Sequence, residues 1–210
     1  MIKNQEQLNS NNVSQIKPFQ VIVEVKLIND RLRFLFQQNQ FNESQKSDSE
    51  VEIGILLTNA VTLLAQIKEE FYNPCFDLSI INKLIDKFVE FSTIHHIVLL
   101  YFERCIMSKL SLNIYEQLIE ILPVLTIILK TQNLNVICSV NTFIMSFLII
   151  YSHQICNQVE IKQLVVLIKQ KAMLQLAALS KNKQISDSKY LQQVIEQNKK
   201  INQQLMYKNQ

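Results

Sequence analysis

Gly54 is the only glycine among the 210 residues, and this scarcity constrains the fold more than any other feature of the sequence. Hairpin turns need glycine where φ is positive, and phosphate-binding loops need it where the backbone closely approaches a ligand. One glycine cannot supply either kind of loop throughout a chain of this length. We therefore expect helices joined by short polar turns, and not a β-sandwich, a Rossmann fold or a P-loop enzyme.

Apolar residues recur at intervals of three and four, which predicts helices with one buried face. The first such row follows Pro18 and consists of Val21, Val25, Ile28, Leu32 and Leu35. The polar stretch 42–49 is expected to be a loop, and a helix is predicted over 51–71. Asp77, with Ser79 close by, is a candidate N-cap for the following helix, and another apolar helix is predicted over 94–107.

Residues 118–129 and 134–155 are the most apolar segments, and the polar turn between them predicts an antiparallel helix pair. Pro123 should either kink the first of these helices or mark its first turn. A membrane-spanning helix needs about 20 mainly apolar residues. Polar residues such as Asn135, Ser139 and Asn141 interrupt the second segment, so we expect a buried helix and no membrane insertion. A membrane hairpin over 118–155 is the alternative.

These patterns predict an all-α fold, a right-handed multi-helix array or α-solenoid-like bundle of about eight helices. We expect a flexible N-terminal tail over 1–17, a helical domain over 18–185 and a basic C-terminal helix over 186–210. A heptad rhythm in the last segment comprises Leu191, Val194, Asn198, Ile201 and Leu205. That helix could dock on the domain itself or pair with a partner helix.

The charge distribution is polarised along the chain. Residues 160–210 contain nine lysines and three acidic residues, a net charge of +6, whereas the preceding residues carry −3. The candidate partner-binding residues are Lys162, Lys169, Lys171, Lys181, Lys183 and Lys189. Such a basic surface could bind nucleic acid, anionic lipid or an acidic protein surface such as tubulin. Ordinary solvation of a lysine-rich helix is the alternative.

No arrangement of side chains predicts catalysis. His95 and His96 are adjacent, so on a helix they diverge by about 100° and cannot chelate one metal ion as residues four apart do. Cys105 lies in an apolar row, where a structural thiol is expected, and Glu116 with Glu120 is typical of a solvated or docking face. We expect no catalytic, cofactor or metal site and no small-molecule substrate. The cysteines lack a C-x-x-C pair and are expected to be reduced core residues: Cys75, Cys105, Cys138 and Cys156.

Several short motifs over 70–185 resemble the conserved carboxy-terminal helical domain of katanin's large regulatory subunit. They are Asp77-Leu78-Ser79, Ile121-Leu122-Pro123, Ile128-Leu129-Lys130-Thr131, Phe147-Leu148-Ile149-Ile150-Tyr151 and Lys169-Gln170-Lys171. The likeness is ungapped only over about 120–155. The family's β-propeller is absent, so the chain is similar to the propeller-less regulatory forms. Gln132-Asn133-Leu134 replaces the family's aromatic-acidic turn, and 90–105 looks like an insertion.

The resemblance implies a non-catalytic regulatory or targeting subunit. Its expected partners are the amino-terminal domain of a katanin-type severing ATPase, microtubules or tubulin, and other proteins of the spindle or cilium. The lysines of the basic segment would then contact acidic tubulin. Residues 1–20 show neither a signal-type apolar stretch nor an Arg-rich presequence, so we expect a cytoplasmic location. The resemblance further implies a location on the cytoskeleton, in a cilium or at a basal body. The alternative function is an α-solenoid structural subunit, or scaffold, of a large cytoplasmic or ciliary assembly.

Overall fold

The computed structural model of the chain describes residues 17–38, 43–108, 111–131 and 133–181, together with Gln192 and Glu196. Within these residues the backbone forms eight α-helices and three short 3₁₀-helices, with no β-strand. The predicted all-α fold of about eight helices is confirmed. The predicted tail over 1–17, except Lys17, and most of the predicted helix over 186–210 lie outside the described residues.

The helices follow one another with short connections. The first half of the chain forms α1 (Pro18–Gln37), α2 (Glu43–Leu64), η1 (Glu69–Phe71), η2 (Asn73–Cys75), α3 (Leu78–Asp86), η3 (Phe88–Glu90) and α4 (His95–Ile106). The second half forms α5 (Ser111–Ile128), α6 (Leu134–Ile150), α7 (Ser152–Cys156) and α8 (Val159–Ser180).

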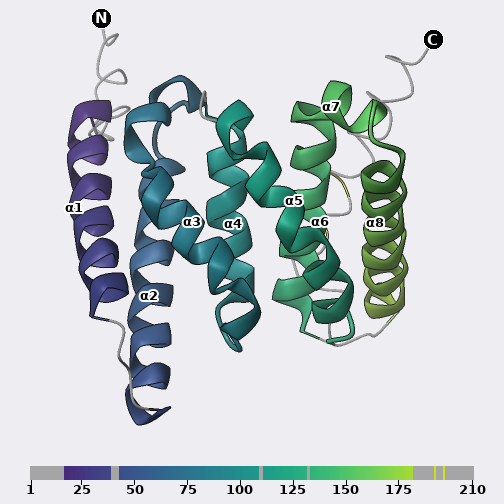
Figure 1. Ribbon diagram of the computed structural model, residues 1–210, viewed down its shortest axis with the longest axis horizontal. Helices are drawn as coiled ribbons and strands as arrows, with labels where there is room; N and C mark the ends of the chain where they lie inside the picture. Colours follow the sequence, from purple (N-terminus) through teal and green to yellow (C-terminus); the bar gives the residue numbers. More distant parts are fainter. Residues whose placement is uncertain are drawn as a thin grey trace, which may run out of the picture.

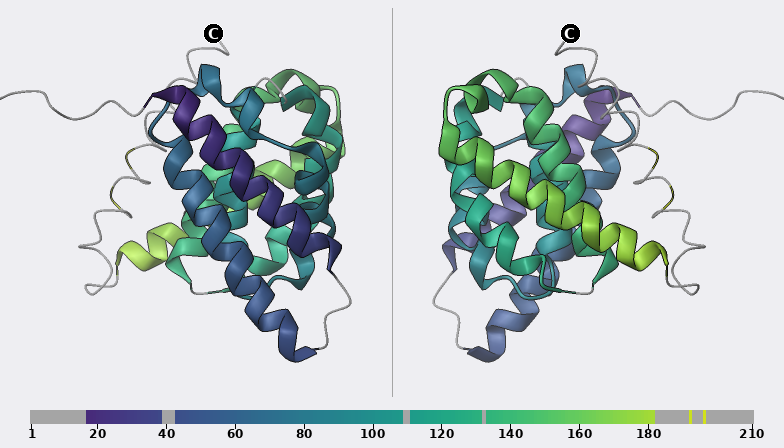
Figure 2. Two further views of the ribbon diagram at one scale, coloured as in Figure 1. Left: turned by 90° about the vertical axis from the view of Figure 1, so that its left-hand side faces the viewer. Right: turned by 90° about the vertical axis from the view of Figure 1, so that its right-hand side faces the viewer.

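The helices form a two-layered array with α1 at one end and α8 at the other (Figure 1). One layer contains α2, α4, α6 and α8, each packed against the next. The other layer contains α1, α3 and α5, and α8 contacts both α5 and α6 at its end of the array. Seen from the α1 end, α1 crosses the outer side of α2, so that α1 is the outermost element there (Figure 2).

Local sequence signals set several helix starts. Pro18 occupies the first turn of α1, where its missing N–H costs no hydrogen bond. The predicted cap at Asp77 is present: its carboxylate accepts hydrogen bonds from the Ser79 N–H (2.8 Å) and the Ser79 hydroxyl (2.6 Å), and it also pairs with Arg33 of α1. Asn133 caps α6 by accepting from Asn135 N at 3.0 Å. These caps satisfy amide groups that have no partner within the helix.

The bounds of α2 differ from the prediction at both ends. The predicted loop over 42–49 is wrong, because α2 already begins at Glu43. This end of the helix projects beyond its neighbours (Figure 1), so its sequence shows no apolar periodicity that would predict a helix. Glu, Gln and Lys nevertheless favour a helix in water. The helix predicted to reach residue 71 ends at Leu64, where the following amides bond three residues back, as Ile67 N does to Leu64 O at 3.2 Å.

The apolar centre of the chain also departs from the predicted pair. Helix α5 continues through Pro123, so the first-turn interpretation of this proline is wrong. The most extensive helix contacts of α6 are with α4 and α8, not with its sequence neighbour α5. The predicted helix over 134–155 is divided at Tyr151 into α6 and α7. Tyr151 is fully buried and completes an aromatic cluster with Tyr115, Phe143 and Phe147.

The core runs the length of the array. Buried apolar side chains from every α-helix form one continuous cluster. Asn29 of α1 is buried within it and donates to Cys75 O at 2.7 Å, which satisfies its amide N–H and links α1 to the connection before α3. Among the described helices, none is both long enough and apolar enough to cross a membrane.

Candidate interaction surfaces

Helix α8 holds the described part of the predicted basic surface. It packs through a narrow row formed by Val165, Ile168, Ala172 and Leu176, which are buried against α5 and α6. Lys162, Lys171 and Lys181 are exposed, and Lys169 is half-buried, which lowers its pKa. Glu160 is the only acidic residue of this helix. The described segment 159–181 is therefore a basic edge of the array.

The lysines of α8 do not share one face. Residues seven apart return to the same side of a helix, so Lys162 and Lys169 lie together beside the buried row. Lys171 is nine residues from Lys162, which at about 100° per residue places it on the opposite side. Lys181 follows the last residue of α8. Lys183 and Lys189 lie outside the described residues, so the structure brings together only two of the six predicted positions.

Aliphatic side chains separate these lysines on the outside of α8. Val159, Val166, Leu167 and Leu174 are exposed, Leu174 to 71%. Lysine side chains carry a long apolar stem beneath the charge. The outer surface of α8 therefore combines apolar area with positive charge and suits an acidic protein partner better than a bare phosphate backbone.

His95, His96 and Cys105 lie in environments that are typical of residues with a structural role. His95 Nε2 lies 3.1 Å from Phe88 O, and its ring packs edge-to-face on the Phe88 ring at 5.0 Å. Burial lowers the pKa of both His95 and His96. Cys105 is fully buried, and burial raises the pKa of its thiol well above its usual range, which is the opposite of what a nucleophile requires.

The remaining predicted residues are placed as follows. Cys75 and Cys138 are free and buried as expected, whereas Cys156 is free but exposed at the end of α7, so its assignment to the core is wrong. Glu116 and Glu120 are both exposed on α5. No group of three or more histidine, cysteine, aspartate or glutamate side chains in the described part of the chain could hold a metal ion.

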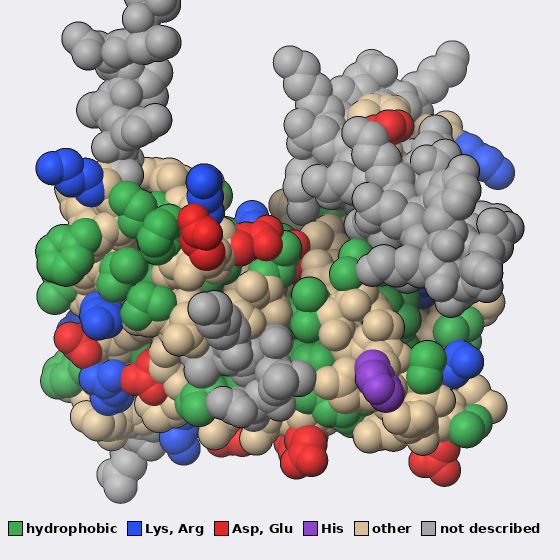
Figure 3. Space-filling view, turned by 90° about the horizontal axis from the view of Figure 1, so that it is seen from above, with side chains coloured by type: hydrophobic (Ala, Val, Ile, Leu, Met, Phe, Trp, Pro, Cys, Tyr) green, Lys and Arg blue, Asp and Glu red, His purple; other side chains and the backbone are tan. Residues whose placement is uncertain are grey.

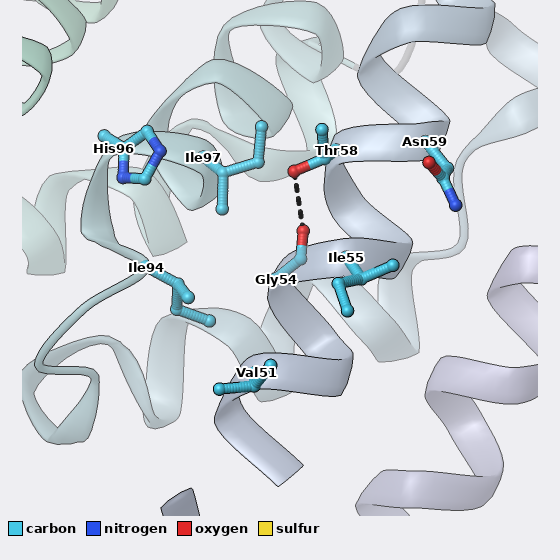
Figure 4. A pocket seen from close by; sticks show the side chains of 8 residues that line it. All are labelled: Val51, Gly54, Ile55, Thr58, Asn59, Ile94, His96 and Ile97. Atoms are coloured by element: carbon cyan, nitrogen blue, oxygen red, sulfur yellow. Dashed lines mark hydrogen bonds between the residues drawn. The ribbon is translucent and has the colours of Figure 1, made fainter. Parts of the chain in front are cut away.

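A shallow apolar groove of about 280 Å³ lies between α2 and the start of α4 (Figure 4). Its lining residues are Val51, Gly54, Ile55, Thr58, Asn59, Ile94, His96 and Ile97. Gly54 lets the two segments approach closely, because a Cβ at this position would lie 2.7 Å from Cγ2 of Ile94. The Thr58 hydroxyl bonds back to Gly54 O at 2.7 Å, so the groove offers mainly aliphatic surface.

Sequence reasoning missed a second apolar row on α1. Phe19, Val23, Leu27 and Phe34 lie on the side of α1 away from its buried row, and all four are exposed. We call these four residues the outer row. Hydrophobic side chains gather at the α1 end of the molecule in the view from above (Figure 3). The signal was present in the spacings of four, four and seven, since a helix with two apolar sides has two surfaces to cover.

Comparison of the chain with protein-family models, with curated proteins and with solved structures gave no match. The likeness to the katanin regulatory subunit therefore stays a prediction made from short motifs, and the surfaces of the array carry the functional proposal.

Proposed function

We propose that the chain is a non-catalytic protein-interaction subunit that helps to target a microtubule-severing ATPase of the katanin type. The observation that carries the proposal is α8, an end helix of the array with three lysines and a single acidic residue. It provides an edge at which an acidic partner such as tubulin can bind while the rest of the array remains available to a second protein.

The chemistry of α8 sets how such binding behaves. Each exposed ion pair contributes about 0–1 kcal/mol, so no single lysine would be decisive. Several lysines facing a strongly acidic surface act together, and salt screens this attraction over a Debye length of about 8 Å at physiological ionic strength. Binding through α8 should therefore be strong at low salt and weaken steadily as salt is added.

The test is microtubule co-sedimentation of the purified full chain, together with binding to the amino-terminal domain of a katanin-type ATPase. K162E/K171E should weaken microtubule binding about tenfold, because two attractive contacts become repulsive. K68E/K83E is the matched control, since Lys68 and Lys83 are also exposed but lie far from α8 in sequence. Equal loss in both variants would refute the role of α8, and binding to neither target would refute the regulator.

A structural subunit of a larger assembly is the second candidate. It is favoured by the divergence of the α8 lysines and by the apolar surfaces at the groove and at both end helices. Contacts through apolar surface would survive about 0.5 M salt, where screening is almost complete beyond a few ångströms. A native complex that stays intact in such salt and contains no severing ATPase would support this second function against the first.

A further inference from the structure

The outer row gives the α1 end of the array an exposed apolar face. Phe19 is 76% and Leu27 63% exposed, and α1 is the outermost helix at this end (Figure 2). Terminal helices of stacked helical arrays usually present a polar outer face, because no further helix covers them. Here two phenylalanines, a leucine and a valine lie in one row along a helix of 20 residues, about 30 Å long.

Charged residues border the outer row on both sides. At about 100° per residue, Glu24 and Arg31 lie on one side of Leu27, and Lys26 and Asp30 lie on the other. Lys26, Asp30 and Arg31 are exposed, and Glu24 is partly exposed. The first border thus has one acidic and one basic residue. The second also includes Arg33, which pairs with Asp30 at 2.8 Å and with Asp77, so in a dimer the Asp30 carboxylate would lie between Arg33 and Lys26 of the second copy.

The positions of these charges match a second α1 running in the opposite direction. In a two-fold antiparallel pair, each border faces the same border of the other helix in reverse order. The midpoint of Glu24–Arg31 falls between Leu27 and Ile28, and the midpoint of Lys26–Asp30 falls at Ile28, so one axis close to Leu27–Ile28 serves both pairs. One axis at this point therefore sets Glu24 opposite Arg31 of the second copy and Lys26 opposite Asp30 of the second copy.

The apolar row fits the same register. With the axis at Leu27–Ile28, the two Leu27 side chains meet at the centre, and Phe34 lies between Phe19 and Val23 of the second copy. In a parallel pair each border would face the other border, which sets Glu24 beside Lys26 and Arg31 beside Asp30 of the second copy. The antiparallel pair in addition sets the two helix dipoles in opposite directions, which is the favourable arrangement. The charge exchange E24R/R31E separates the two orientations, because it restores ion pairs only in the antiparallel pair. Intramolecular contacts hold Arg31 at the border of the row, since it pairs with Glu52 at 2.6 Å and lies over the Phe34 ring at 5.2 Å.

We propose that the outer row of α1 is a homodimer interface in which two copies of the chain pack α1 against α1 in antiparallel orientation about a two-fold axis at Leu27–Ile28. Four ion pairs, two of each kind, border an apolar centre. The interface closes on itself, so the dimer leaves α8 of both copies free for other partners.

Sedimentation equilibrium of the full chain tests the proposal. The wild type should sediment at twice its mass of 24.6 kDa at about 100 μM, a concentration at which even a weak specific interface is largely occupied. L27E should weaken dimerisation at least about tenfold. V89E is the matched control, because Val89 is about as exposed as Leu27, at 69% against 63%, but lies on η3. Circular dichroism would verify that both variants are folded.

A charge exchange tests the orientation. E24R places arginine opposite Arg31 of the second copy and should weaken the dimer, as should R31E, whereas E24R/R31E should restore it. A monomeric wild type at about 100 μM, or equal effects of L27E and V89E, would overturn the interface. Masses that keep rising with concentration would indicate head-to-tail contact between α1 and α8 and would overturn the two-fold arrangement. Failure of the double exchange to restore association would overturn the register.

Discussion

Glu50 of α2 joins two segments that are 42 residues apart in sequence. Its carboxylate accepts hydrogen bonds from the backbone N–H groups of Ser92 (2.7 Å) and Thr93 (2.6 Å) and from both hydroxyl groups. Burial by itself would raise the pKa of Glu50, but these four donors outweigh it, and the pKa is lowered. The ionised carboxylate thus fixes the turn that leads into α4.

Replacing Glu50 with alanine should lower the free energy of unfolding by about 2 kcal/mol at pH 7, because the hydrogen bonds that a charged carboxylate accepts from Ser92 and Thr93 are lost. A carboxylate with a lowered folded pKa stabilises the fold above its unfolded pKa of about 4.3, and this contribution is lost as the pH falls through the folded pKa. Urea unfolding of wild type and E50A at pH 7 and pH 3 should therefore show the difference shrinking in acid.

Glu52 supplies the control for this measurement. It lies on the same helix, is exposed, and pairs with Arg31 at the surface. Such surface pairs contribute about 0–1 kcal/mol, so E52A should change stability little at either pH. A loss in E50A no larger than in E52A, or one that persists undiminished in acid, would contradict the assigned role of Glu50.

At the scale of the helix, local signals were predictable from sequence and end effects were not. The buried row of α1 and the cap at Asp77 were predicted, because each depends on residues within a few positions of one another in sequence. Asn133 was predicted only as part of a polar turn, and the structure shows that it also caps α6. The start of α2 at Glu43 was missed because that end projects into solvent and needs no apolar periodicity. The extensive contacts between α4 and α6 were not predicted, because these helices are not adjacent in sequence and α5 lies between them.

For the candidate surfaces too, composition and local spacing were predictable from sequence, whereas orientation within the array was not. The lysines of α8 were found because composition reports charge, but their divergence around the helix required the orientation of the buried row. The outer row of α1 was not predicted, because the row that includes Val21, Val25 and Leu32 has the more regular helical spacing and by itself accounts for a buried face. Which of two apolar sides faces a neighbour depends on α1 being at the end of the array, a property of the assembled helices.

Gly54 sets the distance between α2 and the turn before α4. Alanine in a helix interior is favoured over glycine by about 1 kcal/mol, but a Cβ here would meet Cγ2 of the buried Ile94 at 2.7 Å. Because overpacking costs about 1–3 kcal/mol, G54A should destabilise the protein by about 1 kcal/mol. I94A removes Cγ2 together with the rest of the side chain beyond Cβ. In that background G54A should therefore raise the stability of the protein.

A double-mutant cycle measured by chemical denaturation checks this coupling between Gly54 and Ile94. The double mutant should be at least about 1 kcal/mol more stable than the sum of the two single-mutant effects predicts. Coupling of this size is typical of side chains in direct contact. A G54A substitution that stabilises both backgrounds equally would mean that α2 moves away from the turn without cost. The close approach would then not constrain the groove.

Across the whole molecule, stability should be distributed as in a short stack of helices. Helix α1 contacts α2, η2 and α3, while α6 lies between α4 and α8 in the middle of the contact network. In such arrays the free energy is roughly the sum of local terms and of terms for neighbouring units. A lesion at the α1 end should therefore loosen that end alone, whereas a lesion at α6 should disrupt both halves.

Leu32 of α1 and Phe147 of α6 are both fully buried and offer matched lesions. L32A should cost about 2–5 kcal/mol and F147A about 3–5 kcal/mol by cavity formation. In hydrogen exchange followed by mass spectrometry, L32A should lower protection mainly in α1 and α2 and leave α6 and α8 near their wild-type values. F147A should lower protection in α4, α5, α6 and α8 together. A uniform loss of protection in L32A would instead establish that the array unfolds as a single cooperative unit, with the end helix as essential as the centre.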